Sequence, residues 1–145
     1  MDLYITKELN SNDKNYVIRL LKEYNSKFLP SDLKEKSEDI HVFLRDENGT
    51  VCGGILGEIY ANWLEIHTFM MDEDIRKHGY GSKLLLEIEQ IAMEKNCDFI
   101  KVDTLSFQAL NFYKKHGYHV FGVIDNAGRD YKHYYLKKDL SDIHV

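Results

Sequence analysis

The chain has 145 residues, a length that suits one domain with a full-sized hydrophobic core. Hydrophobic residues make up 43% and charged residues 30%, and no apolar run approaches the roughly 20 residues of a membrane-spanning helix, so we expect a globular protein with no membrane partner. The net charge of −5 argues against nucleic acid as the main partner, and two distant cysteines, Cys52 and Cys97, argue against a disulfide framework and for a cytoplasmic location.

The first quarter of the chain predicts a strand followed by a helix. Residues 2–9 alternate polar and apolar side chains and predict an opening strand. Residues 11–29 carry apolar side chains at helical spacing, with Ser11, Asn12 and Asp13 as candidate N-caps and Pro30 ending the helix or beginning the next turn. The apolar stripe consists of Val17, Leu20, Leu21, Tyr24 and Phe28. The polar segment 31–39 predicts a loop or a short helix.

Residues 40–71 predict three consecutive antiparallel strands. Asn48 and Gly49 tolerate positive φ and predict a two-residue hairpin turn, and Ala61–Asn62 marks the second turn. If side chains alternate regularly along the third strand, Leu64, Ile66, Thr68 and Met70 share one face of it. The other face then holds Trp63, Glu65, His67, Phe69 and Met71.

The remaining half predicts helices that alternate with strands. A helix after residue 80 has a stripe formed by Leu84, Leu85, Ile88, Ile91 and Ala92. Residues 99–104 predict a short strand, residues 108–117 a short helix that ends at Gly117, and residues 118–124 and 130–140 a final strand pair. The order β-α-β-β-β-α-β-α-β-β gives an α/β sandwich with a mixed sheet, in one domain spanning residues 1–145.

A basic loop with two glycines precedes the helix that begins near residue 80. The first amides of a helix are unpaired and carry partial positive charge, which makes an anion site. Gly79 and Gly81 let a phosphate approach the backbone closely, while Arg76, Lys77 and Lys83 add charge. The spacing excludes a Walker phosphate loop, and the third glycine of a Rossmann fingerprint is missing. On the loop alone, a plain connecting turn is the alternative.

Two motifs together resemble those of one enzyme family. Arg76 to Gly81 resembles the Arg/Gln-x-x-Gly-x-Gly/Ala motif of the GCN5-related N-acetyltransferases (GNAT), and residues 108–122, QALNFYKKHGYHVFG, resemble that family's Ala-x-x-Phe-Tyr landmark with its following Gly-Tyr/Phe pair. The resemblance covers essentially the whole chain. It implies a mostly antiparallel sheet with helices on both faces, and acetyl-CoA as co-substrate without a metal. It also implies direct acetyl transfer to a primary amine of a small molecule or protein, and a homodimer as an option.

The resemblance also implies which residues bind the co-substrate. The loop would hold the pyrophosphate of acetyl-CoA, and the end of the third strand would hold the pantetheine arm. The implied cofactor-binding residues are Phe69, Met70, Met71, Arg76, Lys77, His78, Gly79, Tyr80, Gly81, Ser82, Ser106, Asn111 and Tyr113. Two positions depart from the family pattern, because Ser106 stands in place of the usual Asn and Glu73 in place of a proline.

The same resemblance implies catalytic residues. Tyr113 would be the general acid that protonates the departing thiolate, with a core tyrosine as the alternative. His67 is the candidate base, or orders the water that acts as one, and Glu65 is the second choice; a solvent-facing polar pair is the alternative. His133 lies on a late strand that walls the acceptor pocket in the family. The aromatic residues that could line the same pocket are Tyr24, Phe28, Tyr60, Trp63, Tyr131 and Tyr135.

The identity of the acceptor stays open. The options are a polyamine, an aminoglycoside-like antibiotic, an amino acid or a protein amine, and the acidic net charge favours a small cation. A non-catalytic acyl-CoA-binding or regulatory module of the same fold is the alternative function, and a nucleotide-binding protein is the third.

Overall fold

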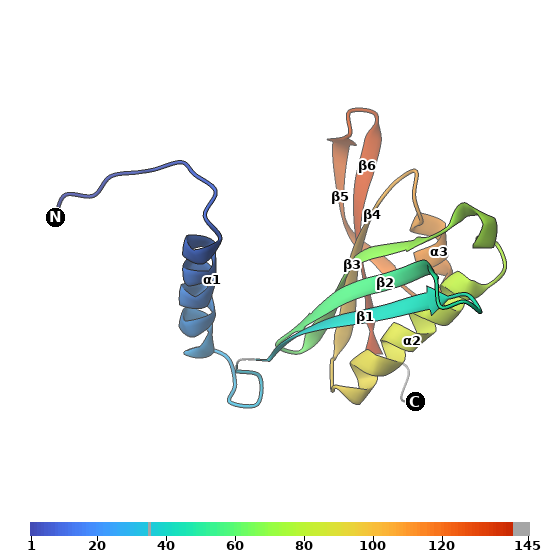
Figure 1. Cartoon of the computed structure of the whole chain (residues 1–145), viewed down its shortest axis with the longest axis horizontal. Helices are drawn as coiled ribbons and strands as arrows, with labels where there is room; N and C mark the ends of the chain where they lie inside the picture. The colour runs from blue at the N-terminus through green and yellow to red at the C-terminus, as the bar shows by residue number, and fades with distance from the viewer. Residues whose placement is uncertain (35, 141–145) are drawn as a thin grey trace. The chain divides into compact units, whose positions relative to one another are not determined.

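The computed structural model describes residues 1–34 and 36–140, and the chain forms two compact units, Met1–Glu35 and Lys36–Val145 (Figure 1). The first unit contains helix α1 (Ser11–Ser26). Its N-cap is Asn10, whose side-chain oxygen accepts a hydrogen bond from the amide of Asp13 at 3.0 Å. The cap therefore lies one residue before the three candidates expected from the sequence. The rings of Tyr24 and Phe28 meet at a centroid distance of 5.2 Å, as their helical spacing predicts.

Two expectations for the N-terminal segment are wrong. Residues 2–9 form neither helix nor strand, because an alternating pattern makes a strand only where a neighbouring strand satisfies its backbone, and no described strand pairs with them. The segment 31–39 is only partly a loop. A turn in which the amide of Leu33 donates to the carbonyl of Pro30 at 2.9 Å opens it, and a strand begins at Ser37.

The second unit is built on a six-stranded sheet in the order β1-β2-β3-β4-β6-β5. Neighbouring strands are antiparallel except β3 and β4, which are parallel, so the mixed and mostly antiparallel sheet is confirmed. The strands are β1 (Ser37–Arg45), β2 (Val51–Tyr60), β3 (Trp63–Met71), β4 (Phe99–Leu105), β5 (His119–Ala127) and β6 (Tyr131–Asp139). The helices of this unit are the 3-10 helix η1 (Glu73–Ile75), α2 (Tyr80–Glu94) and α3 (Leu110–Lys115).

The two predicted hairpin turns have different outcomes. The expected two-residue turn at Asn48–Gly49 is wrong, because residues 46–50 separate β1 from β2. The carboxylate of Asp46 accepts the amides of Asn48 and Thr50 at 2.8 and 2.9 Å, and this wider loop needs a positive φ only at Gly49. The Ala61–Asn62 turn is confirmed, since it joins the end of β2 directly to β3.

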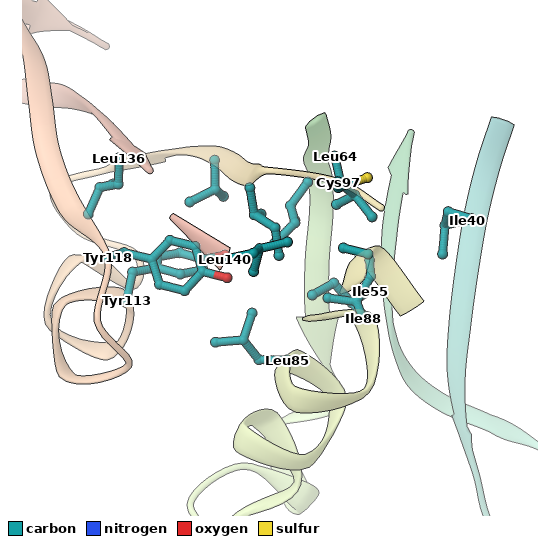
Figure 2. Packing of buried hydrophobic residues seen from close by; sticks show 14 of the residues in the cluster. Ile40, Ile55, Leu64, Leu85, Ile88, Cys97, Tyr113, Tyr118, Leu136 and Leu140 are labelled. Atoms are coloured by element: carbon teal, nitrogen blue, oxygen red, sulfur yellow. The ribbon is translucent and has the colours of Figure 1, made fainter. Parts of the chain in front are cut away.

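The hydrophobic core lies between one face of the sheet and helix α2 (Figure 2). The predicted stripe of α2 is confirmed, because Leu84, Leu85, Ile88 and Ala92 are buried and Ile91 is partly buried. Each fully buried Leu or Ile side chain contributes about 1.5–3 kcal/mol relative to exposure. Side chains of α3 join the same cluster, so helices cover one face of this unit. A helix on the other face stays a prediction, because α1 belongs to the other unit.

A buried ionic group fixes α2 against the C-terminal strands. Glu89 of α2 is 2% exposed and accepts a hydrogen bond from the Tyr118 hydroxyl at 2.7 Å. The ammonium group of Lys138 on β6 lies 3.1 Å from the same carboxylate. Because both charges of this group have a partner, their attraction offsets the cost that burial of an isolated carboxylate would impose.

Candidate active site

The central feature of the site is an opening between β3 and β4. The two strands pair in parallel from Trp63 and Phe99 up to Ile66 and Val102, and no further. Yet β3 continues to Met71 and β4 to Leu105, so the last residues of both strands have no ladder between them (Figure 1). Unpaired backbone groups along such an edge can bind an extended chain that lies between the strands.

A β-bulge shapes the β3 side of the opening. Leu56 of β2 pairs with Thr68 and Gly57 pairs with Ile66, so His67 is the extra residue. The bulge reverses the alternation of side chains, and Phe69 and Met71 pack against the core on the same face as Leu64 and Ile66. His67 lies 3.8 Å from Glu58, the cross-strand partner of Glu65, so it shares the face of Glu65 as expected. The expectation that Phe69 and Met71 share this face is wrong, because they lie beyond the bulge.

The backbone of β3 beyond the bulge is partly free to bind a ligand. The amide of Asp72 donates to the carbonyl of Cys52 on β2 at 2.8 Å. Because backbone groups alternate between the two sides of a strand, those of Met70 also face β2, whereas those of Phe69 and Met71 face the opening. Of the three residues implied to bind the pantetheine arm, two present backbone groups on the correct side.

The N-terminus of α2 follows the end of β3 in the chain, after η1 and a short loop. Gly79 is the N-cap with φ 85°, and Lys77 also has a positive φ of 69°. The amides of Tyr80, Gly81 and Ser82 have no protein acceptor among the residues described, while the amide of Lys83 donates to Gly79 at 3.3 Å. Free N–H groups at a helix N-terminus form an anion-binding site.

The charged side chains of the loop have distinct positions. Arg76 donates from Nε to the carbonyl of Met71 at 3.1 Å, so it fastens the loop to the end of β3. The Lys83 ammonium lies 5.1 Å from the centre of the Tyr80 ring, and the side chains of Lys77 and His78 are exposed. A cavity of about 400 Å³ adjoins the loop. It is lined by Val51, Cys52, Gly53, Met70, Met71, Asp72, Glu73 and Arg76.

Tyr113 is held by aromatic neighbours from β3 and α3 (Figure 2 shows it beside Tyr118). Its ring centroid lies 6.4 Å from that of Phe69 and 5.6 Å from that of Tyr118. Its hydroxyl has no partner in the described part of the chain, where no fully buried polar side-chain atom is left unpaired, so the hydroxyl reaches solvent. Burial and, secondarily, the charge of Asp103 raise the pKa of Tyr113 to about 12. The group therefore holds its proton at neutral pH and can donate it.

A contact between the loop and α3 was not expected from the sequence. The hydroxyl of Ser82 lies 2.9 Å from Nε2 of His116, and Nδ1 of His116 lies 2.8 Å from the carbonyl oxygen of Phe112. A carbonyl can only accept, so in the neutral ring Nδ1 carries the hydrogen and Nε2 accepts from Ser82. No local signal in the sequence pairs two residues that lie so far apart.

The two remaining cofactor-binding candidates belong to the β4–α3 connection and to α3. Ser106 accepts the amide of Lys132 at 3.0 Å through Oγ, which leaves its hydroxyl hydrogen free to donate. Asn111 is exposed on α3, next to the Phe112–Tyr113 pair. Their proposed roles therefore rest on their positions beside the opening.

The candidate bases of the third strand lie among other charges. The Glu65 carboxylate is 3.7 Å from the ammonium of Lys101. His67 projects from the bulge with 52% of its side chain exposed and lies 3.8 Å from Glu58, beyond hydrogen-bond distance. His133 instead makes a close contact, with Nε2 3.0 Å from Oδ1 of Asp103.

Two further observations concern other kinds of site. Within residues 1–34 and 36–140, no group of three or more His, Cys, Asp or Glu side chains is arranged to hold a metal ion. No helix in these ranges is long and apolar enough to cross a membrane.

Known proteins are similar to this chain in sequence and in fold. Residues 8–118 match the model of the acetyltransferase (GNAT) family. A blasticidin-S acetyltransferase from Streptomyces morookaense is 32% identical over 65% of this chain and 70% of its own length. The crystal structure of an acetyltransferase from Bacillus cereus has a TM-score of 0.84 and 34% identity, covering 94% of this chain and 97% of that one. An aminoglycoside 6'-N-acetyltransferase solved with coenzyme A shares the fold, with a TM-score of 0.62 and 19% identity over 90% of this chain and 92% of that one.

The alignments to curated relatives are partial. The matched segments span 63%, 70% and 51% of the lengths of the three relatives that match. The family match covers residues 8–118 and therefore includes α1 and strands β1 to β4.

Proposed function

We propose that this chain, which belongs to the acetyltransferase (GNAT) family, transfers the acetyl group of acetyl-CoA to a primary amine. The observation that carries the proposal is the end of β3–β4 pairing at Ile66 and Val102, followed along the chain by the glycine-capped N-terminus of α2. An elongated carrier with a pyrophosphate at one end and a thioester at the other fits this combination. The whole of residues 1–145 is proposed to act as one N-acetyltransferase domain, because the family match spans both units.

The proposed binding mode uses backbone groups more than side chains. The free amides of Tyr80, Gly81 and Ser82 would bind the pyrophosphate, with the charges of Lys77 and Lys83 nearby. The amide-like pantetheine arm would pair with the exposed edge of β3 at Phe69 and Met71. Met70 would contribute its exposed side chain rather than its backbone, while Arg76 would hold the loop in place through Met71.

The chemistry needs an oxyanion donor and an acid for the thiolate. A backbone amide of β3 that faces the opening would stabilise the negative charge that develops on the thioester oxygen. Tyr113 would protonate the departing sulfur, because its hydroxyl is protonated at neutral pH and has no partner in the described residues. Direct transfer is favoured over a cysteine intermediate, because Cys52 and Cys97 are buried and burial raises the pKa of Cys97.

The acceptor amine must also lose a proton before it can attack. Among the residues of β3, His67 is the candidate for the base or for the residue that orders a water, because it is near the opening and does not face a lysine. Glu65 is the weaker candidate, since Lys101 partly neutralises it.

The proposed acceptor is a small cationic amine. Glu65 and Asp103 lie on β3 and β4, the strands that flank the opening, and Glu58 lies on the adjacent strand β2. The chain carries a net charge of −5. Two of the similar proteins are named for antibiotics, so blasticidin S and aminoglycosides belong in any substrate panel beside polyamines and amino acids. We also propose a cytoplasmic location and a homodimer.

An acetylation screen tests this function. Acetyl-CoA is incubated with the protein and each amine, and the products are detected by mass together with the released thiol. Acetylation of at least one amine, with acetyl-CoA binding shown by calorimetry, is the expected result. Binding of acetyl-CoA without transfer to any amine would favour a non-catalytic module. Protection against heat by ATP and not by CoA would instead indicate a nucleotide-binding protein.

A further inference from the structure

A histidine–aspartate pair lies at the edge of the opening, on strands β4 and β6. The base candidates expected from the sequence lie instead on β3. Asp103 is the first residue of β4 after its last pairing with β3. His133 stands on the adjacent strand β6, with Nε2 3.0 Å from Oδ1 of Asp103. The neighbours Val102 and Leu136 are buried in the core, so Asp103 and His133 project from the opposite face of the sheet.

The contact fixes which nitrogen of His133 can accept a proton. An ionised carboxylate only accepts hydrogen bonds, so Nε2 carries the hydrogen in the neutral ring and Nδ1 has the free lone pair. Nδ1 has no partner among residues 1–34 and 36–140, and none of the unpaired polar side-chain atoms there is fully buried, so this nitrogen is reachable from solvent. The Tyr135 ring, 4.6 Å from the imidazole, packs beside it and limits its rotation.

Asp103 also links this pair to the acid. Its charge contributes to the raised pKa of Tyr113, which means that the two groups are within electrostatic reach of each other. The pair and Tyr113 therefore both lie close to the unpaired end of β4, the pair on the open face of the sheet and Tyr113 on the core side. If the base and the acid lie on opposite sides of the thioester, the amine can attack from the side of the base while the sulfur leaves on the side of the acid.

We propose that His133, oriented by Asp103, is the catalytic base that takes the proton from the acceptor amine; this inference rests on the proposed function. The acceptor ammonium gives one proton to Nδ1 of His133, and the nitrogen then forms a bond to the acetyl carbon. The carbon–sulfur bond breaks and Tyr113 gives its proton to the sulfur. The second proton of the amine passes through water to the Tyr113 phenolate, and His133 releases the first proton to solvent.

His133 is better arranged for this role than His67. The side chain of His133 is 27% exposed and has a carboxylate at hydrogen-bond distance, whereas that of His67 is 52% exposed and its nearest carboxylate is 3.8 Å away. An aspartate that holds an imidazole in one tautomer and stabilises its charged form is the arrangement used by hydrolytic triads. The His133–Asp103 pair could not be predicted from the sequence, because the two residues are on strands separated by a helix and another strand.

Charged groups of neighbouring strands also bear on His133. Asp103 faces it from β4, and several other charged side chains of the sheet form pairs of their own. These pairs are Lys101 with Glu65 at 3.7 Å, Lys137 with Asp139 at 3.1 Å and Lys132 with Asp125 at 3.8 Å. From β5, His119 lies opposite Lys137. Within the described residues, Asp103 is therefore the charged group that lies at hydrogen-bond distance from the His133 ring.

The test compares two acceptors of the same shape and different basicity. Ethylamine is almost wholly protonated at neutral pH, whereas 2,2,2-trifluoroethylamine is largely neutral and needs no base before attack. Thiol release from acetyl-CoA is measured for wild type, His133→Gln, Asp103→Asn and His67→Gln across pH 6 to 9, and for every amine that the acetylation screen identifies. His119→Gln, an exposed histidine on β5, is the matched control.

His133→Gln should lower kcat/KM for ethylamine about 100-fold and for trifluoroethylamine by less than about threefold, with the KM for acetyl-CoA unchanged. Asp103→Asn should lower kcat/KM for ethylamine about tenfold. Added imidazole should partly restore the activity of a further variant, His133→Ala. If His133→Gln keeps the wild-type pH profile, or if His67→Gln alone shows the selective loss, the inference is wrong while the proposed function stands. If the wild-type protein acetylates no amine, the proposed function fails and this inference fails with it.

Discussion

The hydroxyl of Ser82 lies 2.9 Å from Nε2 of His116, and this contact joins the first turn of α2 to the C-terminal end of α3. His116 also bonds the carbonyl of Phe112, the residue next to Tyr113. The proposed pyrophosphate site and the proposed general acid are therefore connected through one imidazole. Loss of this link should disturb both binding and rate, although neither residue of the pair is required for the chemistry itself.

Replacing His116 by Ala should weaken both the fold and the binding of acetyl-CoA. The substitution removes two hydrogen bonds, so the free energy of unfolding should fall by about 1–3 kcal/mol, and Ser82→Ala should cost about half as much. Urea unfolding measures the first effect. Calorimetry measures the weaker binding of acetyl-CoA, as a rise of about threefold or more in the dissociation constant. The exposed neighbour Lys115→Ala is the control, and an unchanged affinity in His116→Ala would show that the contact is only structural.

Gly79→Ala should separate backbone strain from ligand binding. Gly79 has φ 85°, and no protein atom lies within 4 Å of the place that a Cβ would take; Gly49 in the β1–β2 loop shares both properties with φ 81°. Alanine should therefore cost about 1–2 kcal/mol of stability at either position. Only at Gly79 would the new methyl group face a bound phosphate, so the affinity for acetyl-CoA should fall about tenfold or more in Gly79→Ala alone. Equal affinities in the two variants would contradict the proposed pyrophosphate site.

The sequence predicted the elements whose signal is local. The stripe of α2 and the stop at Gly117, which has φ 90°, follow from helical spacing and from glycine's tolerance of that conformation. Two of the errors arose where a single side chain changed the local hydrogen bonding. Asn10 replaced the expected caps, and Asp46 widened the first hairpin loop. In each case a side-chain acceptor one or a few residues outside the expected motif decided the geometry.

Only the site residues that belong to the two motifs could be predicted from the sequence. The loop and Tyr113 could be named from two short patterns, but the bulge at His67 could not, because it depends on the register between β2 and β3. The Ser82–His116 and His133–Asp103 pairs depend on which strands and helices become neighbours in space. Register and neighbourhood are set by packing of the whole core, which a pattern in one segment does not encode.

Tyr113→Phe should lower kcat without weakening acetyl-CoA binding. The variant keeps the ring contacts with Phe69 and Tyr118 and removes only the hydroxyl, which has no partner in the described residues. Because CoA thiolate leaves fairly easily, we expect a fall of about 10- to 100-fold in kcat, at the low end of general acid catalysis. Stopped-flow or steady-state thiol release measures it. Tyr16→Phe, altered at an exposed ring of α1, is the control, and an unaltered kcat in Tyr113→Phe would remove the acid role.

The two buried tyrosines should make the fold sensitive to alkaline pH. Burial raises the pKa of Tyr113 to about 12, and burial together with Glu89 raises the pKa of Tyr118 above its ordinary value. In the unfolded chain both groups lose their protons near pH 10. Above that pH the folded state binds more protons than the unfolded state, so the free energy of unfolding falls as pH rises. The stabilisation is complete below about pH 10, and the share of Tyr113 is lost between pH 10 and about 12.

Urea unfolding between pH 8 and pH 11 tests this linkage. Each raised tyrosine contributes a slope of up to about 1.4 kcal/mol per pH unit above its unfolded pKa, so Tyr113→Phe and Tyr118→Phe should each flatten the decline of the wild-type protein. Tyr118→Phe should also be less stable at pH 8, because Glu89 loses a buried hydrogen bond. Tyr131→Phe, altered at an exposed ring, should keep the wild-type slope. A Tyr113→Phe slope equal to that of wild type would show that its hydroxyl titrates alike in the folded and unfolded chains, which would contradict the raised pKa.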